Sequence, residues 1–234
     1  MTVVGADACP AGWFVTVLEH DHARTDQCPT FEELSDTYED VDRILVDIPI
    51  GLPTDERRRC DVNARDLMGC RGNSVFHPPS EKAIECDDYA TANERHRDSI
   101  GNGLSQQAFH IREKIREVRD SVGEQYDETI RESHPELCFA GLNGQPIAYP
   151  KSSGRGQRLR MQLLNETLDN ADDLYRDARE EYLLKEVRRD DILDAMALAV
   201  AARTGDISTV PSDPAAGEPR IYYPTFEAPA TPLE

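Results

Sequence analysis

The sequence has few lysines, no long apolar run and no closely spaced cysteine pair. The last two shortages argue against a membrane-spanning protein and against a zinc site or a disulfide framework. No apolar stretch reaches the roughly 18 residues that a membrane-spanning helix needs, so we expect no transmembrane segment and no membrane partner. The opening MTVVGADACPAGW lacks the basic start and apolar core of a secretory signal, which predicts a cytoplasmic protein. The six cysteines include no C-x-x-C pair, so we expect reduced thiols.

Positive charge is also scarce. The 234 residues carry 45 acidic against 26 basic side chains, a formal net charge of −19, and the lysines are Lys82, Lys114, Lys151 and Lys185. An acid-rich, lysine-poor composition is typical of a cytoplasm at molar salt, where charge repulsion is screened over about 3 Å, and it favours a halophilic protein. Because repulsion is screened there, the net charge alone does not exclude a nucleic-acid partner.

The spacing of apolar residues predicts an α/β protein. Alternating segments within the first 28 residues predict three strands, an apolar run at 43–48 a fourth, and residues 128–132 a fifth. Helices are expected at 31–36, 104–122, 156–169, 172–188 and 192–202, the last one apolar on nearly every face and therefore buried. We expect a mixed sheet flanked by helices.

This pattern predicts one domain over residues 1–210. The charged stretch at about 55–125 is expected to be a helical insertion that covers one edge or face of the sheet. Residues 211–234 carry six prolines and are predicted to form a tail without compact structure, apart from a strand at IYYP.

Several acidic residues fall on strands or on the buried helix, where a carboxylate is unusual unless it has a partner or a function. Asp7 is expected to end the first strand, and Asp47 to lie inside an apolar strand, where a charge is costly unless it is paired or metal-bound. Asp191 and Asp194 share one face of a helix, and Glu132 ends a later strand. Acids that meet at one sheet edge predict a Mg²⁺ or Mn²⁺ site. The alternative is that they cap a helix and a turn.

Two groups of basic residues stand out against the acidic background. They are Arg57, Arg58, Arg59, Arg65 and Arg71, and then Lys151, Arg155, Arg158 and Arg160. Because guanidinium groups match phosphate geometry, we predict that Arg71 and Arg155 bind substrate, with hydrogen bonds from Ser74 and His77. His134, also placed at the substrate site, would move protons or orient the strand end. The alternative is that the arginines form ordinary ion pairs with the abundant acids.

Six segments, in order, resemble domain of unknown function family 429, classed as predicted nucleases of the RNase H-like superfamily. They span about residues 3–203 and read VGADACPAGWFV, ILVDIPIGLP, RRCDVNARDLMGCRGNSVF, LSQQAFHIREKIREV, ESHPELCF and DDILDAMALA. The resemblance implies a five-stranded sheet with its first three strands antiparallel. It also implies two divalent cations bound by Asp7, Asp47, Asp191 and Asp194. Because Glu132 lies on the fifth strand, it competes for the place of fourth ligand.

The activity implied by this resemblance is two-metal hydrolysis of phosphodiester bonds in DNA or RNA. Asp7 would bridge the ions, while Lys151 and Arg71 would steady phosphate charge. A non-catalytic cation-binding module of the same fold is an alternative. An ATP-binding protein of the actin-like or sugar-kinase type is a further one, disfavoured because no glycine-rich loop follows the first or fourth strand. A homodimer is left open.

Overall fold

The centre of the fold is a mixed sheet of five strands in the order β3-β2-β1-β4-β5. The computed structural model describes residues 1–122 and 129–226. The strands are β1 (Thr2–Cys9), β2 (Gly12–Glu19), β3 (His22–Cys28), β4 (Arg43–Val46) and β5 (Ile130–Glu132). The first three pair antiparallel, whereas β4 runs parallel to β1 and β5 parallel to β4. This confirms the predicted α/β sheet and its antiparallel start.

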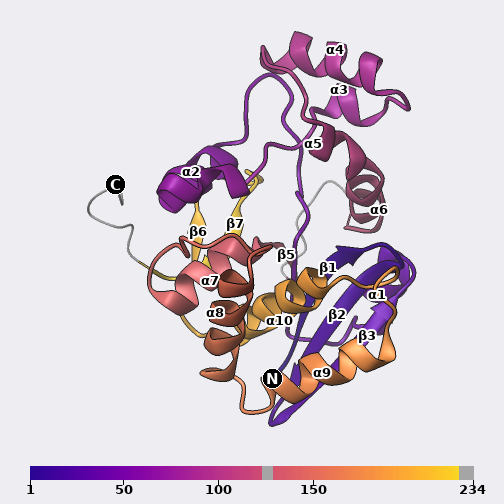
Figure 1. Ribbon diagram of the computed structural model, residues 1–234. Coiled ribbons are helices and arrows are strands. Elements are labelled where there is room, and N and C mark those ends of the chain that lie inside the picture. Colours follow the sequence, from indigo (N-terminus) through magenta and orange to yellow (C-terminus); the bar gives the residue numbers. More distant parts are fainter. Residues whose placement is uncertain (123–128, 227–234) are drawn as a thin grey trace.

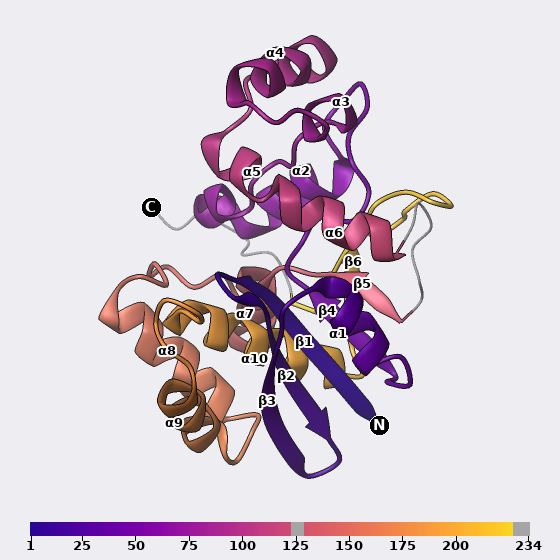
Figure 2. The same cartoon turned by 90° about the vertical axis from the view of Figure 1, so that its right-hand side faces the viewer.

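Helices cover both faces of the sheet (Figures 1 and 2). On one face lie α7 (Pro135–Asn143), α8 (Gly154–Asn165), α9 (Ala171–Glu181) and α10 (Arg189–Arg203). On the other face lie α1 (Phe31–Thr37) and α6 (Arg112–Val122). Because β-strand side chains alternate, Val3 packs on the α10 face and Val4 on the α1 face, and both are fully buried.

Helix α10 lies directly against β1, and a glycine makes this approach possible. A Cβ atom on Gly5 would lie 2.2 Å from both the Ala195 carbonyl oxygen and the Ala199 nitrogen, so no other residue fits there without moving the helix. The apolar residues of α10 are buried on every side, as the sequence predicts. The close contact brings the first turns of α10 beside the end of β1.

The predicted insertion is helical, but its longest predicted helix is divided. It comprises α2 (Arg59–Met68), a 3₁₀ segment η1 (Gly69–Ser74), α3 (Glu81–Ile84), α4 (Tyr89–Ile100), α5 (Gln106–His110) and α6. The single helix expected over 104–122 breaks at Ile111. The Arg112 side chain at the break donates to the carbonyls of Cys86 and Phe109, so tertiary contacts outweigh helix propensity. Positions 123–125 of the predicted insertion lie outside the described residues.

Two strand boundaries differ from the prediction. Strand β1 continues through Asp7 to Cys9, so Asp7 lies within the strand. Strand β4 ends at Val46, so Asp47 comes directly after the strand, and Pro49 lies shortly beyond. The fifth strand begins at Ile130, and position 128 of its predicted range lies outside the described residues. Helices α8 and α9 are shorter than predicted.

The described part of the proline-rich segment packs on the fold. Strand β6 (Ile207–Val210) pairs with β7 (Ile221–Pro224), which forms at the predicted IYYP. Tyr223 and Phe226 are buried, and Pro224 lies against Gly141 of α7. In the part of the chain that the structure describes, no helix combines the length and the apolar character needed to cross a membrane.

Candidate functional site

Strand register places Asp7 and Asp47 side by side. Ala6 pairs with Val46, and the Asp47 backbone N–H donates to the Ala6 carbonyl at 3.1 Å, which extends the β1–β4 pairing by one residue. Both acids follow the alternation of Gly5 and Leu45 and therefore point to the α10 face. Asp7 is 8% exposed, so this carboxylate is almost fully removed from solvent.

Helix α10 adds two more acids to the same place. One carboxylate oxygen of Asp191 accepts the Arg188 backbone N–H at 2.8 Å, so this residue caps the helix, as the structural alternative predicts. Asp194 is 1% exposed, and its Oδ1 atom is buried without a hydrogen-bond partner in the described structure. A buried, unpaired carboxylate oxygen is costly, so this atom points to a missing cation or donor.

Lys151 supplies the positive charge. Its Nζ atom lies 2.6 Å from Asp194 Oδ2 and 3.5 Å from Asp190 Oδ2, and it comes from the segment that precedes α8. We call Asp7, Asp47, Asp191, Asp194 and Lys151 the acidic site. One ammonium group faces four carboxylates there, so the site carries uncompensated negative charge.

The pKa values reflect this imbalance. Burial, and then the charges of Asp47, Asp194 and Asp191, raise the pKa of Asp7 well above its ordinary value, while Lys151 opposes the shift. Burial raises the pKa of Asp194 to about 6, again against the effect of Lys151. Such shifts are expected where several carboxylates share a site of low polarity. A divalent cation would relieve both causes.

Burial and neighbouring charges also shift the pKa values of the other three residues of the acidic site. Burial raises the pKa of Asp47, opposed by His134 and Lys151. Burial also raises the pKa of Asp191, opposed by the Arg188 backbone N–H. For Lys151, burial alone would lower the pKa, but Asp194, Asp7 and Asp47 raise it above its ordinary value. The ammonium therefore stays protonated at neutral pH.

Glu132 lies apart from the acidic site, because it points to the opposite face of the sheet. It pairs in register with Val46, and Val46 with Ala6, so its side chain alternates with those of Asp7 and Asp47. Its two oxygens accept from Arg58 at 2.7 and 2.8 Å. The structure therefore places Glu132 outside the acidic site and the helix acids Asp191 and Asp194 within it.

Arg58, Asp61 and Glu132 form what we call the paired cluster. Arg58 ion-pairs with both acids, and all three side chains are at least 96% buried. Burial opposes the charge of Arg58, yet Asp61 and Glu132 raise its pKa well above the ordinary value. Burial likewise opposes ionisation of Asp61, but Arg58 lowers its pKa. The internal guanidinium thus neutralises this cluster.

The paired cluster also contains a grouping of metal-ligand atoms. Among the described residues, Cys60, Asp61 and Glu132 place one ligand atom each within 4.8 Å of one another. The Arg58 guanidinium already fills the position that a cation would take. Burial raises the pKa of the Cys60 thiol above its ordinary value, which opposes the thiolate that a metal needs. We therefore assign this grouping a structural role.

The predicted substrate groups near α7 are engaged in local structure. His134 caps α7: its Nδ1 accepts from the Glu136 N–H, and its Nε2 lies 3.2 Å from the Ser74 carbonyl oxygen. The Ser74 hydroxyl donates to the Arg71 carbonyl at 2.7 Å. Arg71 lies 4.0 Å from Glu136. Apart from the charge of His134 acting on Asp47, these residues shape the surroundings of the acidic site rather than entering it.

The arginines of the two basic groups differ in whether they form ion pairs with acids. Arg58, Arg59 and Arg160 form ion pairs with acids, as the structural alternative predicts. In the described part of the chain, Arg155 and Arg158 form none. They line a hollow of about 570 Å³ together with Tyr149, Leu159 and Gln162. The Arg155 guanidinium lies 4.1 Å from the centre of the Tyr149 ring, so an aromatic and two free cations border the segment that carries Lys151.

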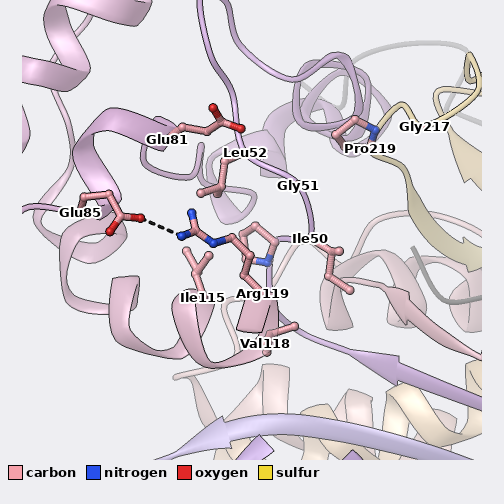
Figure 3. A pocket seen from close by; sticks show the side chains of 11 residues that line it. Ile50, Gly51, Leu52, Glu81, Glu85, Ile115, Val118, Arg119, Gly217 and Pro219 are labelled. Carbon is pink, nitrogen blue, oxygen red and sulfur yellow. Dashed lines mark hydrogen bonds and ion pairs between the residues drawn. The ribbon is translucent and has the colours of Figure 1, made fainter. Parts of the chain in front are cut away.

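A second cavity, of about 570 Å³, lies on the α6 face of the sheet (Figure 3). Apolar side chains such as Ile50, Leu52 and Ile115 line it, and the Arg119–Glu85 ion pair, at 2.8 Å, borders it. No acid of the acidic site lines this cavity. No sequence motif indicates this cavity, because the loop at 217–219 completes it from a distant part of the chain.

The acidic site has the donors that Mg²⁺ or Mn²⁺ requires. Its ligands are carboxylate oxygens alone, which favour hard divalent cations over zinc or copper. The unpartnered Asp194 Oδ1 shows that internal donors do not satisfy every carboxylate oxygen of this site. The raised pKa values of Asp7 and Asp194 reflect burial first. Burial also raises the pKa of Glu132, to about 7, even beside Arg58. The donor chemistry therefore fits a divalent cation. Among the described residues, no three of these acids bring ligand atoms within 4.8 Å of one another, so a bound ion would have to draw the carboxylates together.

Comparison with known proteins identifies a family. Residues 5–216 match the model described as "Protein of unknown function (DUF429)". This range includes β4, α10 and residues 5–9 of β1, and hence every residue of the acidic site. No curated protein and no solved structure matches the chain.

Proposed function

Since the chain belongs to the DUF429 family, we propose that it is a metal-dependent nuclease with an RNase H-like fold, which hydrolyses phosphodiester bonds. The observation that carries the proposal is the convergence of Asp7, Asp47 and Asp194 on one face of the sheet. The buried oxygen of Asp194 without a partner supports a missing cation there. The strand order, three antiparallel and two parallel, supports the fold assignment.

Asp7, Asp47 and Asp194 are the residues that would hold Mg²⁺ or Mn²⁺, with Asp191 beside them. A divalent cation in such a site lowers the pKa of a bound water and shields the charge of a phosphate. The sheet fixes Asp7 and Asp47 through backbone pairing, and the packing of α10 on Gly5 fixes Asp194. Rigid elements therefore set the ligand positions, as precise catalysis requires.

The substrate would bind through charges that the protein leaves free. Lys151 lies at the acidic site. Arg155 and Arg158, on the helix α8 that follows Lys151, line a separate hollow and form no ion pairs in the described residues. Guanidinium and ammonium groups bind phosphate oxygens without reading bases, so we expect cleavage with little sequence preference. Tyr149 offers a ring on which a base can stack.

Deep burial favours a second candidate, a non-catalytic cation-binding module. Asp7 is 8% and Asp194 1% exposed, which suits a structural cation as well as a catalytic one. In that case metal would raise thermal stability, and substitutions in the site would change stability alone. The free Arg155 and Arg158 favour the nuclease, because a structural ion needs no phosphate-binding surface.

The test is cleavage of labelled single-stranded DNA, duplex DNA, RNA and branched DNA with Mn²⁺ at molar KCl. We compare the wild type with Asp7→Asn, and use Asp173→Asn, an exposed acid of α9, as the matched control. Cleavage by the wild type and the control, lost in Asp7→Asn, would support the nuclease. Equal cleavage by Asp7→Asn would contradict it. Mn²⁺ binding without cleavage of any substrate would favour the module.

A further inference from the structure

Some carboxylate oxygens of the acidic site already accept a hydrogen bond, and others are left to bind a cation. Lys151 occupies Asp194 Oδ2 at 2.6 Å, and the Arg188 backbone N–H occupies one oxygen of Asp191 at 2.8 Å. Asp194 Oδ1 is buried without a hydrogen-bond partner in the described structure. The Asp7 and Asp47 carboxylates interact with the charge of Asp194, and neither has an internal donor among the hydrogen bonds of the described residues. The occupied oxygens thus belong to Asp191 and to the Oδ2 atom of Asp194, which binds Lys151. The oxygens without a donor are Asp194 Oδ1 and those of the acids on the β1–β4 side.

From this division we propose that the acidic site binds one divalent cation, and that the ammonium of Lys151 takes the place of a second. The inference rests on the proposed function and refines it, because the family resemblance implies two ions. One ammonium and one dication together carry three positive charges against four carboxylates. A second dication would have to displace Lys151 from Asp194.

Lys151 is held in position by its own backbone segment. The Ser153 hydroxyl donates to the Pro150 carbonyl at 2.8 Å and accepts from the Gly156 N–H at 3.0 Å. A Cβ atom on Gly156 would lie 2.1 Å from the Pro150 carbonyl oxygen, so this turn needs glycine there. The segment is therefore compact on both sides of Lys151.

A buried guanidinium anchors the same segment to α7. Arg160 is fully buried, donates to the Tyr149 carbonyl at 3.2 Å, and binds both oxygens of Glu136 at 2.7 Å. A lysine that merely neutralised a surface acid would need no such support. The anchoring indicates that the ammonium has a set position at the acidic site, as a cation in a coordination site has.

The experiment measures Mn²⁺ stoichiometry and affinity by isothermal titration calorimetry, with the thermal shift on Mn²⁺ addition as a second readout. The variants are Lys151→Met, which removes the ammonium, and Lys151→Arg, which keeps a positive charge. The matched control is Lys114→Met, which removes an ammonium paired with Glu117 on α6, on the other face of the sheet. Circular dichroism verifies that each variant is folded.

We expect one Mn²⁺ per chain in the wild type, Lys151→Arg and Lys114→Met. Lys151→Met should take up a second Mn²⁺, or bind the first at least about tenfold more tightly, a change of about 1.4 kcal/mol. Two ions in the wild type would overturn the inference while leaving the proposed function intact. Unchanged stoichiometry and affinity in Lys151→Met would also overturn it. No binding by the wild type would overturn the proposed function as well.

Discussion

Two buried groups of acids lie near the carboxyl ends of β4 and β5, on opposite faces of the sheet, and they differ in how their charge is balanced. In the paired cluster, Arg58 binds Asp61 and both oxygens of Glu132. In the acidic site, one ammonium faces four carboxylates, and Asp194 Oδ1 has no partner in the described structure. Burial alone therefore does not distinguish the two groups of acids; the balance between carboxylates and internal cations does.

The paired cluster also explains what Glu132 does. Its Oε2 accepts the Ile50 backbone N–H at 2.7 Å, and Arg58 donates to the carbonyls of Ile50 and Gly51. These bonds hold the segment directly after Asp47. The paired cluster thus supports one ligand of the acidic site from behind, through the backbone.

The largest effect is expected from removing the internal cation. Arg58→Met leaves Asp61 and Glu132 buried without a counter-charge, and should lower the unfolding free energy by about 3–5 kcal/mol. The control is Arg59→Met, whose ion pairs with Asp213 and Glu218 lie at the surface and should contribute far less to stability. Denaturant unfolding measures both. Equal losses would show that the paired cluster does not depend on Arg58.

The next effect concerns how α10 is placed. Gly5→Ala puts a methyl group against the backbone of α10 and should destabilise the protein by about 1–3 kcal/mol, with weaker Mn²⁺ binding because Asp194 moves away from Asp7. Gly154→Ala is the control, because nothing lies within 4 Å of a Cβ there. Unfolding and Mn²⁺ titration check both variants. Unchanged Mn²⁺ affinity in Gly5→Ala would contradict the role of this contact.

A smaller effect of opposite sign is expected inside the acidic site. Burial and three neighbouring acids raise the pKa of Asp7, so its ionisation opposes folding at neutral pH. Asp7→Asn should therefore raise the metal-free unfolding free energy. Burial also raises the pKa of Glu132, to about 7, but Glu132→Gln removes one of the two acids that pair with the buried Arg58, and this loss should lower the unfolding free energy. If both variants changed the unfolding free energy in the same direction, the proposed difference between the acidic site and the paired cluster would be wrong.

A further effect is a pH dependence set by Asp194. Its pKa in the folded protein, about 6, lies above the ordinary value of 3.8, so the folded state holds the proton more tightly between these values. This group's contribution to metal-free stability should fall as pH rises from about 4 to about 6, and then level off. Mn²⁺ affinity should rise over the same range, because the ligand must lose its proton.

That dependence is measured as the difference between the wild type and Asp194→Asn at each pH, which cancels the titration of other groups. Asp173→Asn, on the exposed surface of α9, should show no such difference from the wild type. If the stability difference between the wild type and Asp194→Asn did not change between pH 4 and pH 6, the raised pKa of Asp194 would be contradicted.

Much of this arrangement could be predicted from the sequence. The alternation of the first strands, the apolar run before Asp47 and the apolar faces of α10 predict the sheet and the helix packed on it. The same patterns place Asp7, Asp47 and the α10 acids at one edge. These signals are local, because strand alternation and helix periodicity depend on residues close together in the chain.

The rest depends on contacts that no local pattern carries. The face on which Glu132 lies is set by the register of a three-residue strand, and one step of register would reverse it. The pairing of Arg58 joins residues 74 positions apart. The anchoring of Lys151 through Arg160 needs α7 and α8 to be packed together. Such choices appear only once the chain is folded.

The measurement that tests the central claim most directly is Mn²⁺ titration at molar KCl of the wild type, Asp7→Asn and Glu132→Gln. The claim is that the acidic site, and not the paired cluster, binds the cation. We predict that Asp7→Asn weakens binding at least about tenfold, whereas Glu132→Gln changes it far less. Binding that survives Asp7→Asn but is lost in a folded Glu132→Gln would contradict the account.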